Sequence, residues 1–236
     1  MNPAQRAQLG DVWALRCRVE HEAARRFDRL AAAIPEFDPD SPIPPLLRSA
    51  ADDERRHATL CADLAARYGR AATDRGTDVR VAPAGLLLRD AVLYEMVAAC
   101  CVTETESVAT VTTLLGTRLD PTVEKVLREI ARDEVAHGRI GWAHLAREAS
   151  QRSVAFLSPW IPTMLAGSID GALLAATGPA ENGDAVLAHG VFPPARKREV
   201  FVATLQQVVF PGLERFGIEV RPARGWIAEH LRVGAG

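Results

Sequence analysis

Residues 53–57 read Asp-Glu-Arg-Arg-His, and residues 133–137 read Asp-Glu-Val-Ala-His. The string Asp-Glu-x-x-His thus occurs twice in a chain with only six histidines. A spacing of three residues places a Glu and a His beside each other on one face of a helix. The residues on either side of each string therefore indicate whether that face is buried.

Both strings lie within apolar helical stripes. Residues three and four apart around the first string are Leu47, Ala50, Glu54, His57, Cys61, Leu64 and Tyr68. Around the second string they are Val123, Leu127, Ile130, Glu134, His137, Gly141 and Leu145. Since an apolar stripe of this period packs toward a core, the sequence predicts that both Glu-His pairs face the interior.

Four long segments rich in Ala, Leu, Arg and Glu are predicted to be helices. They span about 4–34, 43–69, 84–116 and 121–150 and are separated by breaks rich in Pro, Gly and Asp. The first and last breaks are short, which favours antiparallel neighbours, whereas the middle break is long enough for a crossover. This pattern predicts an all-α protein in which two hairpins form a four-helix bundle with its second and third helices parallel.

The other two helices each place one acid in an apolar stripe. The stripe of the first helix is Trp13, Cys17, Glu20, Ala24, Phe27, Ala31 and Ile34, and that of the third is Leu93, Val97, Cys100, Glu104, Val108, Val111 and Leu115. Glu22 and Glu106 are alternatives, but Glu22 shares its side with arginines and Glu106 lines up with threonines. We therefore expect Glu20 and Glu104 to be the buried carboxylates.

Four carboxylates in an apolar core need compensating cations, because an isolated buried charge costs several kcal/mol. The stripes contain no Lys or Arg. Four Glu and two His supply an excess of oxygen donors, which suits two iron ions, or manganese with iron. The predicted metal ligands are Glu20, Glu54, His57, Glu104, Glu134 and His137, and the alternative is a metal-free bundle held by salt bridges.

This ordered set resembles that of ferritin-like di-iron carboxylate proteins over about residues 4–150. The leading Asp makes each string similar to the motif of bacterial di-iron monooxygenases, in which that Asp supports a ligating histidine. The resemblance implies that Asp53 contacts His137 and that Asp133 contacts His57, across the bundle.

Three departures leave the subfamily open. Cys61 stands where radical-generating ribonucleotide reductase subunits have a tyrosine, and Val108 stands where multicomponent monooxygenases often have a threonine. Ser107 replaces the additional glutamate of rubrerythrin-like peroxidases.

The resemblance favours an O2-activating oxidoreductase, an oxidase or oxygenase that acts on a small organic substrate. Its electrons would come from a separate donor or from the substrate itself. No catalytic residue beyond the metal ligands is predicted. Two alternatives are a ferritin-like protein that stores iron or detoxifies peroxide, and a metal-free structural bundle.

The bundle is expected to span 1–150, and 151–236 a C-terminal helical extension packed on it, with its clearest helix near 195–216 and a disruption at Pro211. A net charge of −2 gives no reason to expect nucleic acid or a membrane surface as a partner. We expect neither a signal peptide nor a membrane span. The four cysteines form no Cys-x-x-Cys, which is typical of reduced thiols in a cytoplasmic protein, and we expect a monomer or small homo-oligomer.

Overall fold

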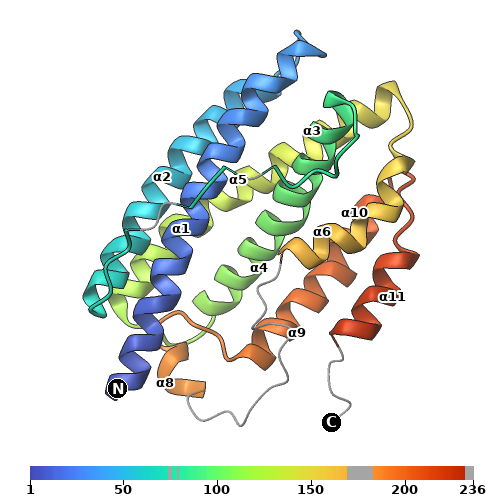
Figure 1. The fold of residues 1–236 in the computed structure, drawn as a ribbon. Coiled ribbons are helices and arrows are strands. Elements are labelled where there is room, and N and C mark those ends of the chain that lie inside the picture. Colours follow the sequence, from blue (N-terminus) through green and yellow to red (C-terminus); the bar gives the residue numbers. More distant parts are fainter. Residues whose placement is uncertain (74–75, 79, 169–182, 232–236) are drawn as a thin grey trace.

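The computed structural model describes residues 1–73, 76–78, 80–168 and 183–231, and within these ranges the chain is helical without strands (Figure 1). The all-α prediction is therefore confirmed for this part of the chain. No helix in the described ranges combines the length and apolar character needed to cross a membrane.

Four long helical segments lie close to their predicted positions. They are α1 (Pro3–Ala33), α2 (Ile43–Arg67), a third segment that begins with α3 (Leu88–Met96) and ends with α4 (Glu104–Leu115), and α5 (Pro121–Gln151). The third segment starts at Leu88 rather than near residue 84, because Gly85 adopts a φ of 89° and Leu87 is extended. Side-chain caps fix two other starts: Asn2 forms a capping box on α1, and Asp120 accepts from Thr122 N and Val123 N on α5.

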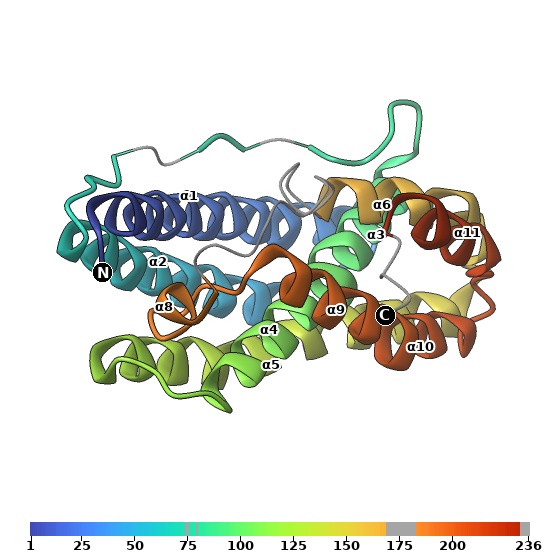
Figure 2. The same ribbon diagram turned by 90° about the horizontal axis from the view of Figure 1, so that it is seen from below.

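The segments form two hairpins that pack side by side. A short turn with a 3-10 helix, η1 (Ile34–Glu36), joins α1 to α2, and a second short turn joins α4 to α5. The described parts of the connection between α2 and α3, residues 68–73, 76–78 and 80–87, lie along the length of the molecule, and α4 runs in the same direction as α2 (Figures 1 and 2). Helix α5 packs against both α2 and α4. The two expected pairs of neighbouring helices, α1 with α2 and α4 with α5, are therefore packed against each other.

The third segment is interrupted by a π-helix, η2 (Val97–Thr103), immediately before Glu104. The Thr103 hydroxyl donates to Ala98 O at 3.0 Å, which satisfies one carbonyl of this wider turn. Gly141 of α5 makes room for it, because a Cβ at Gly141 would lie 2.4 Å from Cys100 Cβ and 3.1 Å from Cys100 C. π turns inside α-helices often occur at functional sites, and this one ends directly before Glu104.

The C-terminal extension adds short helices around one side of the hairpins. They are η3 (Ala155–Trp160), α6 (Ile161–Ser168), α8 (Gly183–Leu187), α9 (Pro194–Thr204), the π-helix η4 (Leu205–Val209), α10 (Phe210–Glu214) and α11 (Arg221–His230). The predicted disruption at Pro211 appears as η4, which directly precedes α10; a proline cannot donate to the carbonyl four residues before it.

A buried apolar cluster holds one part of this extension to the hairpins. Leu165, Leu213 and Ile227 belong to the same buried cluster as Val97 and Leu145, so apolar burial joins the two parts. The extension therefore shares a core with α5 and the third segment, although the boundary at residue 150 rests on sequence alone.

At the other end, the loop after α8 inserts between α1, α2 and α5. Trp13 Nε1 donates to His189 O at 3.3 Å, and Tyr68 Oη lies 2.9 Å from His189 Nδ1. Gly190 has a φ of 77°, and a Cβ there would approach Val123 Cγ1 to 2.8 Å. The loop therefore packs on the N-terminal half of α1 and on the start of α5.

Candidate metal centre

Two groups of side chains meet in the middle of the four long segments. Donor atoms of Glu20, Glu54, His57 and Glu134 lie within 4.8 Å of one another, and so do donor atoms of Glu54, Glu104, Glu134 and His137. Glu54 and Glu134 belong to both groups, whereas each group has its own histidine and its own further glutamate. The geometry is that of two adjacent cation positions with two shared carboxylates.

Each long segment contributes to this arrangement in the way its local sequence dictates. The three-residue spacing turns Glu54 and His57 to one face of α2, and Glu134 and His137 to one face of α5. All six side chains predicted as ligands are in the two groups, including Glu104 from the start of α4. Five of these residues are buried and Glu20 is half-buried.

Both histidines direct Nδ1 toward the shared glutamates. His57 Nδ1 lies 3.4 Å from Glu54 Oε2 and 3.8 Å from Glu134 Oε1. His137 Nδ1 lies 2.9 Å from Glu54 Oε1 and 3.6 Å from Glu134 Oε2. The edge of Phe27 packs on the His137 ring with centroids 5.9 Å apart, which limits the orientations available to that ring.

The donor atoms fit a pair of metal ions. Both Nδ1 atoms, both Glu54 oxygens and Glu134 Oε2 are buried without a hydrogen bond to the described residues. Buried polar atoms are seldom left unpaired in native proteins, so a cluster of such atoms aimed at one place needs a ligand to satisfy it. Carboxylate oxygens with two imidazole nitrogens are a set that iron and manganese accept.

The pKa values of the glutamates in the cluster also indicate that additional positive charge is needed there. Burial, together with the nearby Glu54, raises the pKa of Glu20 well above its usual value. Burial and Glu134 do the same to Glu104. Burial opposes the charged form of Glu54 as well, yet its contacts with His137 and His57 outweigh burial and lower its pKa to about 2. The protein therefore gathers more carboxylates than its own cations can balance.

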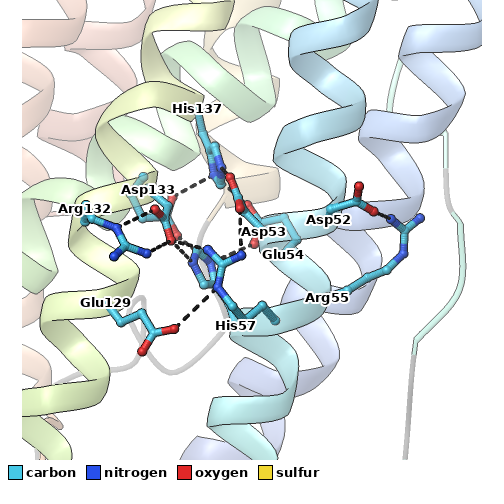
Figure 3. A network of polar contacts seen from close by, with 11 residues as sticks. Asp52, Asp53, Glu54, Arg55, His57, Glu129, Arg132, Asp133 and His137 are labelled. Carbon is cyan, nitrogen blue, oxygen red and sulfur yellow. Dashed lines mark hydrogen bonds and ion pairs between the residues drawn. The ribbon is translucent and has the colours of Figure 1, made fainter.

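Each histidine contacts an aspartate of the opposite helix through Nε2, the ring nitrogen that faces away from the shared glutamates (Figure 3). His57 Nε2 lies 3.2 Å from Asp133 Oδ2, and His137 Nε2 lies 3.3 Å from Asp53 Oδ2. This is the crossed arrangement implied by the family resemblance. A carboxylate at this position keeps the proton on Nε2, which leaves the Nδ1 lone pair free to bind a metal.

Arg56 joins the two supporting aspartates, a contact that sequence reasoning missed. Its Nη1 donates to Asp53 Oδ1 at 2.8 Å, and its Nη2 makes a short hydrogen bond to Asp133 Oδ2. Glu129 and Arg132 complete the network, with Arg132 Nε donating to Asp133 Oδ1 at 3.0 Å. The signal available in the sequence was a cation three residues after Asp53, on the side of α2 that faces α5.

The neighbouring groups are less suited to bind metal. Thr110 donates to Glu106 Oε1 at 2.7 Å, and Glu22 lies 4.0 Å from Arg18 Nε; neither Glu belongs to the two metal-binding groups. Burial raises the pKa of Cys61 and of Cys100 well above its usual value. Both are therefore neutral thiols, which are poor nucleophiles.

No protein-family model, curated protein or solved structure matches this chain. The functional interpretation is thus based on the geometry and chemistry of the site.

Proposed function

We propose that this chain is a ferritin-like protein that binds two iron ions, or one manganese and one iron, and uses them to oxidise a small organic molecule with O2. The observation that carries the proposal is the sharing of Glu54 and Glu134 between two groups that each add one His and one Glu. This matches the pattern of di-iron carboxylate bundles, in which two helices carry Glu-x-x-His and two carry a Glu.

When bound, the reduced metal pair would supply the electrons for O2 reduction and the oxidising power for the substrate. The chain provides the surroundings for this chemistry. Glu54 and Glu134 hold both positions together, and their burial keeps bulk water away. Asp133 and Asp53 accept the Nε2 protons of His57 and His137, which orients both rings with Nδ1 toward the shared glutamates.

Glu20 and Glu104 differ in their surroundings, which gives the site two sides. Glu104 is buried beneath the π-helix and α5, whereas Glu20 is half-buried. Arg16, one turn before Glu20, donates to Gly190 O at 3.0 Å and carries a positive charge beside that carboxylate. The two unshared carboxylates therefore have different environments, with a guanidinium on the Glu20 side.

Metal stoichiometry and O2 consumption test the proposal. Anaerobic titration with Fe(II) should saturate at two ions per chain, and exposure of the loaded protein to O2 should consume O2 and produce a transient absorption. Glu54→Gln should abolish both, because it removes a shared ligand. Glu22→Gln, which changes a carboxylate outside the cluster on α1, should retain both.

The same experiment separates the alternatives. Uptake of many iron ions per chain by a large assembly would replace the proposal with iron storage. Failure to bind metal, with Glu54→Gln indistinguishable from the native chain, would replace it with a structural bundle. Turnover of peroxide in preference to O2 would identify a peroxidase.

A further inference from the structure

A groove of about 580 Å³ lies between α4 of the second hairpin and the helices α9 and η4 of the C-terminal extension. One wall is the outer side of α4, and the other is formed by α9 and η4. Figure 2 shows α9 running antiparallel to α4, and η4 packs near the start of that helix. The volume falls within the range of about 300–1,000 Å³ that is usual for small-molecule sites.

The groove extends along α4 toward the metal centre. Val108 and Thr112 line it, and they continue the i, i+4 ridge of α4 that begins at Glu104. Thr105, the residue after Glu104, also lines the groove. A Cβ at Gly138 would lie 3.9 Å from Thr105 Oγ1, so Thr105 stands against the turn of α5 that carries His137. One end of the groove is thus lined by the residue that directly follows Glu104.

The lining restricts the chemistry of an occupant. Val108, Ala109, Val200 and Ala203 make the walls mainly apolar. Hydroxyl groups and one amide, that of Gln207, interrupt the apolar surface. Such a lining suits an apolar molecule with one or two groups that exchange hydrogen bonds.

Charge is nearly balanced in the groove. Its two charged residues are Arg196 and Glu199, and Arg196 Nη1 donates to Glu199 Oε2 at 2.8 Å. Both lie in the first half of α9, and because α9 runs antiparallel to α4, this half lies toward the C-terminal end of α4. An anionic head group would have to displace Glu199 from Arg196. A phosphate would also lack the cluster of cations or amides that normally binds it.

We propose that this groove binds the organic substrate of the metal centre, and that the substrate is an uncharged, elongated, mainly apolar molecule bearing a hydroxyl or carbonyl group. The substrate role depends on the proposed function, whereas the binding of such a molecule does not. Its polar end lies near Thr105 and Gln207, beside Glu104, and its apolar body lies along Ala109 and Ala203.

Binding is tested first without metal, with the neutral dye Nile red as the probe. Ala109→Trp and Ala203→Trp each fill the groove from one wall and should weaken Nile red binding at least tenfold. Leu46→Trp, at an exposed position of α2 outside the groove, should leave it unchanged. Unchanged binding in both groove variants, with native circular dichroism, would overturn the proposal.

Competition then defines the ligand class. 1-Decanol and decanal should displace the dye at concentrations at least tenfold lower than decanoate, because only the carboxylate carries a charge. Equal or stronger displacement by decanoate would refute the assignment to uncharged molecules.

Proximity to the centre is measured by nuclear magnetic relaxation. In protein loaded with Mn(II), the protons near the oxygen of bound 1-decanol should relax much faster than in protein loaded with Zn(II), and Ala109→Trp should remove the difference. Equal relaxation in the two forms would overturn the substrate role. If relaxation is enhanced but the iron form consumes no O2, the groove assignment stands and the proposed oxidation fails.

Discussion

Replacement of Arg56 by Ala tests whether the network behind the histidines supports metal binding. The guanidinium bridges Asp53 and Asp133, each of which contacts one histidine of the cluster. Without it, both carboxylates lose a fixed donor and the imidazole rings lose part of their orientation. Loss of such a supporting contact typically lowers metal affinity about 10- to 100-fold, which corresponds to about 1.4–2.7 kcal/mol.

The cost to folding should be smaller than the cost to metal binding. The Arg56 side chain is 39% exposed, so solvent screens its ion pairs, and such pairs contribute about 1 kcal/mol or less. Arg56→Lys keeps the charge but lacks the planar fork that reaches both aspartates, and its affinity should fall between those of the native chain and the alanine variant.

Arg55→Ala is the matched control. Arg55 is also an arginine of the first motif, but its partners are Asp28 and Asp52, outside the histidine network. Co(II) and Fe(II) affinities would be measured by competition with a chromophoric chelator, and stability by urea unfolding of the metal-free protein. Equal affinities of Arg56→Ala and Arg55→Ala, within twofold, would refute this reasoning.

Three further predictions concern stability. Arg67 is the main cause of the lowered pKa of Asp120, so this pair stabilises the fold above the unfolded-state pKa of about 4 and loses its effect progressively as the pH falls below it; the deficit of Asp120→Asn in urea unfolding should be about 1 kcal/mol at pH 7 and shrink steadily as the pH falls from about 4 toward 2, and a deficit independent of pH would contradict this. Gly141→Ala places a methyl against Cys100 and should cost about 1–3 kcal/mol; Cys100→Gly in the same chain removes the nearest of these contacts and should recover part of the cost, and no recovery would show that the side-chain contact is not the cause. Gly190→Ala combines a positive φ with an approach to Val123 and should lower the melting temperature by several degrees, whereas Gly225→Ala, which meets no atom within 4 Å, should not.

The local structure of this chain was largely predictable. The useful signals were the spacing of Glu and His, the apolar stripes and the breaks rich in Pro, Gly and Asp. Each of them extends over only a few neighbouring residues, and helix formation is determined over the same short distance along the chain. They placed the four long segments and selected Glu20 and Glu104 over Glu22 and Glu106, and the structure brings the selected pair into the cluster.

The π-helix before Glu104 was not predictable from periodicity. Residues 92–102 are all buried. A π turn changes the phase of the alternation between buried and exposed positions, and this stretch has no exposed positions from which such a change of phase could be detected. The crossed contacts between aspartates and histidines came from family resemblance, because spacing along one helix carries no information about the partner across the bundle.

The sequence by itself determined which side chains share a helical face, since that relation is set by 3.6 residues per turn. It thereby determined the all-helical fold and the identity of the carboxylates and histidines that point inward. Only the tertiary structure decided that Glu54 and Glu134 belong to both groups, that Arg56 spans two aspartates and that a groove lies between α4 and α9. These are distances between atoms on different helices, and they depend on how the helices pack rather than on the order of residues within any one of them.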